Sequence, residues 1–130
     1  MTRRVWAWAP ALLWAAVLFA FSSRSTLPGD LGGGLDKVAH FGAYAVLGLL
    51  LAWASLESRL AAGWPVLLGL AYAASDEVHQ YFVPGRSPDV ADWMADALGV
   101  AAGCFLLYRV RPRLPGAGRP SDVAADSART

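Results

Sequence analysis

The sequence predicts an all-α fold, a small integral membrane bundle of four transmembrane helices followed by a disordered cytoplasmic C-terminal tail. The chain has 130 residues, of which 56% are hydrophobic. Its apolar residues lie in four long runs of about 16–20 residues, close to the length that crosses a hydrocarbon core about 30 Å thick. We therefore expect a four-helix transmembrane domain over residues 1–110 and a tail over residues 111–130.

The first two runs are almost free of charge. Val5–Ser23 carries none, and its Trp6 and Trp8 lie where the aromatic belt of a membrane interface is expected. A loop rich in glycine and proline separates this run from the next. The second run, Val38–Leu56, contains His40 as its only ionisable residue. We expect its helix to begin near Asp36, because a carboxylate complements the helix dipole at an N-terminus.

The third and fourth runs are joined by a short polar connection. Leu60–Ser75 carries no charge, and its helix is expected to continue to Tyr81, before the turn signal Pro84–Gly85. The fourth run, Val90–Tyr108, follows at once and is interrupted by two carboxylates. Beyond Val110 the chain has few bulky apolar residues, so it cannot bury enough surface to offset the entropy of ordering.

The charged residues are sorted between alternate connections. The formal net charge is +1, so the basic footprint of a nucleic-acid-binding protein is absent and no nucleic-acid partner is expected. The ends of the chain and the second connection are basic, with Arg3, Arg4, Arg59, Arg109, Arg111, Arg113 and Arg119. The first and third connections are mostly acidic, with Asp30, Asp36, Asp76, Glu77 and Asp89. The positive-inside rule then places both termini in the cytoplasm.

Polar side chains recur at helical spacing on three of the four runs. They are Asp36, His40 and Tyr44 on the second run, Tyr72, Asp76 and Gln80 on the third, and Asp89, Asp92 and Asp96 on the fourth. Glu77 is displaced from Asp76 by about 100°. A carboxylate at mid-membrane costs roughly 2.5–3.5 kcal/mol on insertion scales, so other parts of the protein must receive these acids.

These residues predict an outward-facing polar pocket where three helices meet. Arg86, in the tight connection before the fourth run, is the expected counter-charge for the acids. The predicted ligand-binding residues are Asp36, His40, Tyr44, Asp76, Glu77, Gln80, Arg86, Asp89, Asp92 and Asp96. His79 lies off these faces and is expected to be exposed. Gly99 and Gly103 are expected to permit close helix packing. Cys104, the only cysteine, is expected to be a small buried residue.

The order of these motifs resembles the VanZ-like membrane protein family over roughly Phe19–Gly103. The resemblance rests on D-K-x-x-H-F at Asp36–Phe41, E-x-x-Q at Glu77–Gln80 and P-G-R-x-x-x-x-x-D at Pro84–Asp92. Asp96 departs from the pattern, which commonly has Asn at this position. The additional acid changes the charge of the predicted pocket and, with it, the expected ligand preference.

The resemblance implies a multi-pass protein of the bacterial plasma membrane that is linked to the cell envelope or to the response to glycopeptide antibiotics. The founding member of the family is associated with low-level resistance to teicoplanin. A resemblance of this kind implies a location and a biological setting, and it supplies no reaction.

Three classes of function are compatible with the sequence. The first is a binding module whose pocket holds the polar head of a membrane lipid, a lipid-linked envelope precursor or an amphipathic drug such as a glycopeptide. The second is a structural or regulatory membrane partner whose ion pairs fix helix register. The third is a metal-dependent lipid-modifying enzyme, but no metal-hydrolase spacing and no serine with a paired base is found. We therefore expect binding, with no catalytic residue, no metal and no cofactor.

Overall fold

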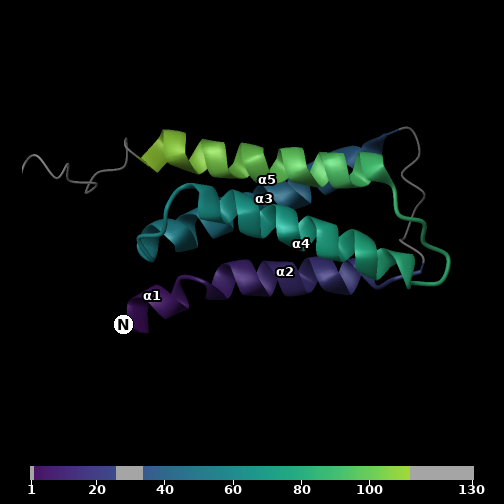
Figure 1. Cartoon of the computed structure of the whole chain (residues 1–130), viewed down its shortest axis with the longest axis horizontal. Helices are drawn as coiled ribbons and strands as arrows, with labels where there is room; N and C mark the ends of the chain where they lie inside the picture. The colour runs from purple at the N-terminus through teal and green to yellow at the C-terminus, as the bar shows by residue number, and fades with distance from the viewer. Residues whose placement is uncertain (1, 26–33, 112–130) are drawn as a thin grey trace, which may run out of the picture.

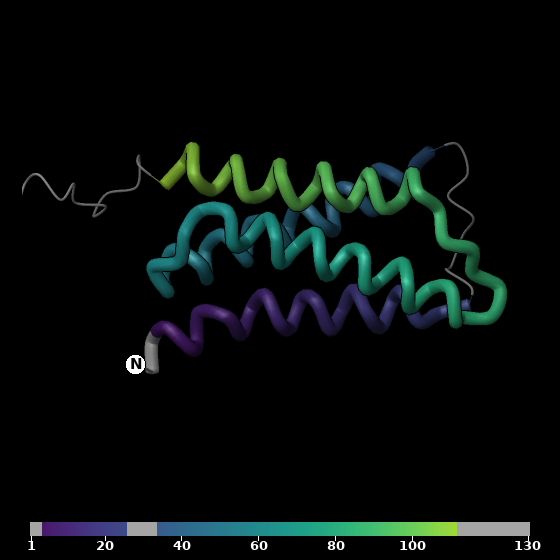
Figure 2. The backbone as a smooth tube through the Cα atoms, in the orientation of Figure 1, coloured from purple at the N-terminus to yellow at the C-terminus, as the bar shows by residue number. Residues whose placement is uncertain are grey.

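The computed structural model describes residues 2–25 and 34–111, and every regular element in these ranges is helical. The elements are α1 (Thr2–Trp6), α2 (Ala9–Ser22), α3 (Leu35–Glu57), α4 (Gly63–Tyr81) and α5 (Val90–Val110). Figures 1 and 2 show the long helices side by side along the longest axis, with α3 and α4 between α2 and α5. The all-α prediction is confirmed for these residues.

The first apolar run is broken into α1 and α2, whereas the sequence predicted one continuous helix. Pro10 causes the break, because it has no N–H and its ring clashes with the carbonyl four residues earlier, that of Trp6. The Trp8 N–H instead donates to the Val5 carbonyl at 3.2 Å, which closes a turn. Pro10 then lies in the first turn of α2, where its missing N–H leaves no hydrogen bond unmade.

Within the described part of the chain, three helical segments are long and apolar enough to cross a membrane, Arg4–Ser22, Leu35–Glu57 and Val90–Val110. The helix α4 is not among them, because its last turns carry Asp76, Glu77, His79 and Gln80. Its bounds nevertheless agree with the sequence, since it runs to Tyr81 and ends before the turn at Gly85. The four-span topology therefore stays a prediction.

The closest packing in the bundle joins α3 to α5 through glycines. A Cβ atom on Gly99 would overlap the carbonyl oxygen of Phe41, and one on Gly103 would overlap that of Ala45. Gly48 of α3 lies equally close to the backbone of Val100. These contacts confirm the predicted packing role of Gly99 and Gly103, because only the absence of side chains lets the two backbones approach.

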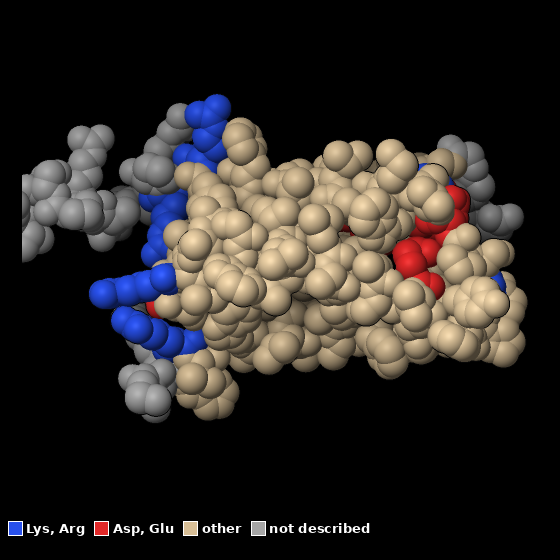
Figure 3. All heavy atoms as spheres, viewed as in Figure 1, with Lys and Arg blue, Asp and Glu red and all other residues tan. Residues whose placement is uncertain are grey.

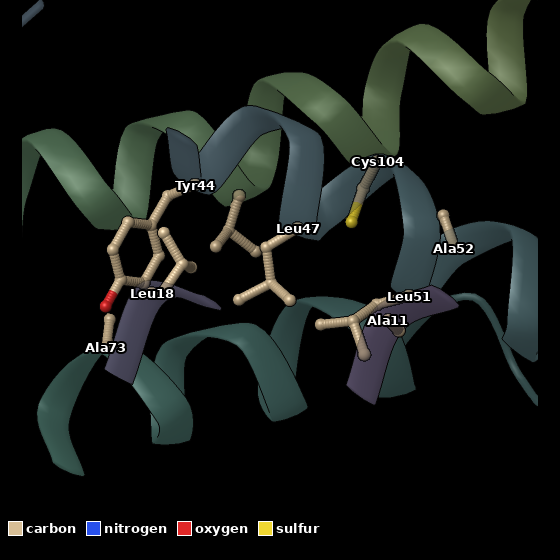
Figure 4. Close-up of a cluster of buried hydrophobic side chains, with 9 residues drawn as sticks. Ala11, Leu18, Tyr44, Leu47, Leu51, Ala52, Ala73 and Cys104 are labelled. Carbon is tan, nitrogen blue, oxygen red and sulfur yellow. The ribbon is translucent and has the colours of Figure 1, made fainter. Parts of the chain in front are cut away.

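The apolar core lies along the buried face of α3. Figure 4 shows Tyr44, Leu47 and Leu51 directed toward α2 and α4, with Cys104 of α5 nearby. Cys104 is buried, as predicted, and its thiol donates to the Gly48 carbonyl at 3.3 Å. Two side chains also hydrogen-bond the backbone of a neighbouring helix, because Trp14 Nε1 donates to Ala43 O at 2.9 Å and the Tyr72 hydroxyl to Ala15 O at 2.6 Å.

Charges gather at the two ends of the bundle and leave an apolar middle (Figure 3). The end with α1 and the last turn of α5 is basic, and Arg111 pairs there with Glu57 at 3.2 Å. The opposite end is acidic, and its carboxylates reach the surface between α4 and α5. The side chain of Arg3, Asp30 in the first connection, and the predicted tail from residue 112 onward, with Arg113 and Arg119, lie outside the described residues.

A polar site at the acidic end of the bundle

Lys37, in the first turn of α3, is the cation at the centre of the acidic end. Its ammonium lies 2.8 Å from Asp89 Oδ2 and 3.3 Å from Asp36 Oδ2, and it also donates to Asp92 Oδ1. The close approach of α3 and α5 brings this lysine to the start of α5. The expected counter-charge, Arg86, is not the one that contacts these acids, so that expectation was wrong.

Asp89 has two roles at the start of α5. Its carboxylate caps the helix by accepting a hydrogen bond from the Ala91 N–H at 2.9 Å. The adjacent Lys37 ammonium, and after it this capping bond, hold the pKa of Asp89 below its usual value. The Asp89 N–H in turn donates to Glu77 Oε2 at 3.3 Å, which links the connection to α4.

His40 and Asp96 form the next layer, one helical turn further into the bundle. The distance between His40 Nδ1 and Asp96 Oδ1 is 2.9 Å, and the Asp96 side chain is fully buried. Asp96 lies one turn after Asp92 on α5, just as His40 lies about one turn after Lys37 on α3. The regular spacing on both helices therefore repeats a cation-to-carboxylate contact when His40 is protonated.

The third layer connects α3 to the last turns of α4. The buried Tyr44 hydroxyl donates to Asp76 Oδ2 at 3.0 Å, and Gln80 Nε2 approaches the same oxygen at 3.3 Å. Arg86 Nη2 donates to Gln80 Oε1 at 3.0 Å. The turn at Gly85, whose φ is +80°, folds Arg86 back onto α4 and away from Asp89.

Three buried carboxylate oxygens in this region have no hydrogen-bond partner among the described residues. They are Asp76 Oδ1, Glu77 Oε1 and Asp96 Oδ2. The other oxygen of each carboxylate is engaged by a protein group, so each acid is half satisfied. The structure thus brings all ten predicted ligand-binding residues to one end of the bundle, and it adds Lys37 to them.

A comparison with known protein families shows to which family the chain is related. The sequence profile described as VanZ/LLP1 matches residues 3–111, which include every residue of the polar site. The chain belongs to the VanZ/LLP1 family. Neither the comparison with curated proteins nor the comparison with solved structures found a match. Family membership and the apolar helices together indicate a multi-pass membrane protein.

The structure also brings together two residues that the sequence left apart. His79 Nε2 lies 2.9 Å from Ser23 Oγ, and the half-buried His79 ring stacks on Phe19 with centroids 4.4 Å apart. The Ser23 hydroxyl donates to Phe19 O at 2.7 Å, so its one proton is already engaged and the imidazole N–H is the donor to Ser23. The contact ties α2 to α4. The partners are 56 positions apart in the sequence, so no local spacing could have revealed the contact.

The acidic side chains are spread along the helices. Within residues 2–25 and 34–111, no three His, Cys, Asp or Glu side chains come together as metal ligands do. Asp36 and Asp92 contact the Lys37 ammonium, whereas His40 contacts Asp96 one turn deeper and Glu77 accepts from the Asp89 N–H. The site therefore offers carboxylate oxygens as hydrogen-bond acceptors, and Lys37, His40 and Tyr44 hold these carboxylates in place.

Proposed function

We propose that this VanZ/LLP1-family protein binds the polar head of a membrane lipid, a lipid-linked envelope precursor or an amphipathic drug at its acidic end. The observation that carries the proposal is the set of buried carboxylate oxygens without a protein partner at Asp76, Glu77 and Asp96. A buried acceptor left unpaired costs about 1–3 kcal/mol, and a ligand that donates hydrogen bonds removes this cost. The apolar helices around the site suit the tail of such a ligand.

The proposed topology has four crossings of the bacterial plasma membrane, with both termini in the cytoplasm. It is supported by the basic residues at the end of the bundle that holds α1 and the last turn of α5, with Arg59 between α3 and α4. In this topology α4 crosses beside the others, and its polar last turns are covered by α3 and α5. The polar site then faces outward, where envelope precursors and glycopeptides are found.

Binding is preferred over catalysis because the polar groups are arranged as acceptors. The Ser23 hydroxyl is held by a backbone carbonyl, and His40 is held by Asp96. A link to glycopeptide response rests on the family alone, and it is testable as a change in teicoplanin sensitivity when the chain is expressed in a susceptible bacterium.

The decisive experiment is native mass spectrometry of the detergent-extracted protein and its Asp96→Asn variant. Asparagine keeps the shape of the side chain, removes its charge and restores the residue common in the family pattern. We expect a lipid or drug-sized adduct on the wild type that is reduced at least about tenfold on Asp96→Asn, since a charge-assisted hydrogen bond is lost. Equal adducts on both proteins, with equal melting temperatures, would contradict the proposal.

A matched control removes an acid at the other end of the bundle. Glu57→Gln eliminates one carboxylate, which pairs with Arg111, and leaves the polar site untouched. The adduct should persist on this variant. Its loss there would show that general charge, and not the acidic site, retains the adduct.

A structural role is the second candidate, and the contact of Lys37 with three carboxylates favours it. Such a network fixes the register of α3 against α5 even when nothing binds. The double variant His40→Leu/Asp96→Leu separates the two readings. Both roles predict that this variant folds. A structural role predicts that its drug sensitivity and its adduct are unchanged, whereas the binding role predicts that the adduct is lost.

A further inference from the structure

The polar site holds more negative charge than its own cations balance. Among the residues that the structure describes, six carboxylates gather there and the side-chain cations in contact with the site are Lys37 and Arg86, so six less two leaves a formal charge of −4 when His40 is neutral. Arg24, at the end of α2, stacks over the Phe21 ring instead. The six acids are Asp36, Asp76, Glu77, Asp89, Asp92 and Asp96.

The cations already present are engaged. The Lys37 ammonium contacts three carboxylates, and Arg86 donates to the Gln80 amide oxygen. An anionic group entering the site would have to displace these partners and would meet the surrounding carboxylates. The charge of the site therefore disfavours a ligand whose recognised group is a phosphate or a carboxylate.

The buried unpaired oxygens identify what the site lacks. Asp96 is 0% exposed and Asp76 is 5% exposed, and each has one oxygen bound by a protein donor and one oxygen with no partner among the described residues. Both free oxygens are acceptors, so they require N–H or O–H donors. A donor that also carries positive charge would satisfy the unpaired oxygens and would offset the excess negative charge of the site.

The arrangement of the acids favours an extended ligand over a single ion. Within the described ranges, no three acidic or histidine side chains converge as metal ligands do. The unpaired oxygens come from Asp76 and Glu77 on α4 and from Asp96 on α5, so they line the junction of two helices. A ligand with several donors along its length is able to reach more than one of them.

We infer that the site recognises a protonated amine that carries further N–H or O–H donors, as in the ethanolamine head of a lipid or in an amino sugar. This inference rests on the binding function proposed above and narrows its ligand class. The shared chemistry is the ammonium group, and its source is either a membrane lipid or a soluble amine.

The test compares lipids that differ in the head group. Short-chain phosphatidylethanolamine, its N-acetylated analogue and phosphatidylglycerol are added at equal concentration to the full chain in detergent, and bound lipid is measured by native mass spectrometry. We expect phosphatidylethanolamine to be favoured at least about tenfold over the N-acetylated analogue, because acetylation removes the charge that strengthens the hydrogen bonds. Equal binding of these two lipids would overturn the inference.

Variants connect the preference to the site. Asp96→Asn should reduce the preference for the amine to nearly one, and Glu57→Gln should leave it unchanged. Asp76→Asn is the second test in case Asp96→Asn fails to fold, because asparagine still offers an oxygen to Tyr44. A full preference retained in whichever of these two site variants folds would overturn the inference.

The remaining outcomes distinguish the amine inference from the proposed binding function on which it rests. Displacement of the lipid by free glucosamine would assign the amine to a soluble source, and failure to displace bound phosphatidylethanolamine would assign it to the lipid; both support the inference. Stronger binding of phosphatidylglycerol that depends on Asp96 would overturn the amine inference and leave the binding function standing. No difference between wild type and Asp96→Asn for any probe would overturn both.

Discussion

Lys37 organises the acidic end of the bundle because one ammonium meets carboxylates from three parts of the chain. Asp36 lies beside it on α3, Asp89 in the connection before α5, and Asp92 in the first turn of α5. Deeper in the bundle, the Tyr44 hydroxyl donates a hydrogen bond to Asp76. At the scale of residues, the site is thus a set of acids arranged around a small number of donors on α3.

Replacing Lys37 with methionine should lower the melting temperature of the protein, because three carboxylates lose their common cation. The measurement is thermal unfolding of the detergent-solubilised protein. Arg111→Gln, at the opposite end, removes a half-exposed pair and should cost less than about 1 kcal/mol. A larger loss for Arg111→Gln than for Lys37→Met would contradict this assignment.

The same lysine should govern the titration of Asp89. Because Lys37 holds the pKa of Asp89 low in the folded state, the stability that Asp89 contributes is present above its unfolded value of about 3.9. That contribution is lost as the pH falls through the lower folded value. In Lys37→Met, the carboxyl ¹³C resonance of Asp89 should titrate at a higher pH than in the wild type. An unchanged midpoint would show that Lys37 is not the cause.

Tyr44→Phe should cost about 1–2 kcal/mol of stability, because the buried Asp76 loses the donor at 3.0 Å and keeps only Gln80 at 3.3 Å. The ring itself remains, so packing in the core is preserved. Tyr108→Phe is the matched control, since its hydroxyl makes an exposed contact of 3.4 Å with Ala62 O. Chemical denaturation of both variants measures the difference, and similar values for the two would refute the expectation.

At the scale of elements, the pairing of α3 with α5 brings the first two layers of the polar site together. Gly99 and Gly103 on α5 and Gly48 on α3 remove side chains from the contact, so the two helices lie with their backbones in contact. This approach places Lys37 over Asp92 and His40 over Asp96, in successive layers. The helix α4 then covers the site from the side with its polar last turns.

Gly103→Val should therefore destabilise the protein by about 3 kcal/mol or more, because its side chain meets the backbone of Ala45, which has no room to move aside. The control is Gly42→Ala, in the same helix pair, where nothing lies within 4 Å of the added Cβ atom. That change should be neutral or slightly stabilising, since alanine favours helix over glycine. Yield of folded protein and melting temperature measure both variants; a folded Gly103→Val of normal stability would disprove the close contact.

At the scale of the whole molecule, one end of the bundle is basic, the other is acidic, and apolar helices separate them (Figure 3). The positive-inside rule uses this separation of charge, so the separation predicts an orientation in the membrane. The family match over residues 3–111 covers both ends and the helices between them. Orientation is accordingly a property of the whole chain, and it is tested on intact cells.

A membrane-impermeant maleimide should label Ser87→Cys in intact cells and should label Arg59→Cys only after the membrane is permeabilised. The two positions lie at opposite ends of α4, so this pattern requires α4 to cross the membrane. The native Cys104 is buried and gives the low background that the experiment needs. Labelling of both cysteines in intact cells would contradict the four-span topology.

Much of the fold follows from the linear sequence. The bounds of α3, α4 and α5 agree with the predicted helices within a few residues, because long apolar runs, the acidic cap at Asp89 and the turn at Gly85 are local signals. The break at Pro10 was not predicted, although a proline excludes a hydrogen bond to the residue four positions earlier. The ten predicted site residues share one end for the same reason: helical spacing aligns them on each helix.

What the tertiary structure alone decided is which residue meets which. The sequence offered Arg86 as the counter-charge because it is near Asp89 in the chain, but the glycine contact of α3 with α5 gives that place to Lys37, and the turn at Gly85 gives Arg86 to Gln80. The contact of Ser23 with His79 depends in the same way on how α2 lies against α4. Local spacing determines the face on which a residue lies, whereas the partner across that face is set by the distance between helices, which only packing fixes.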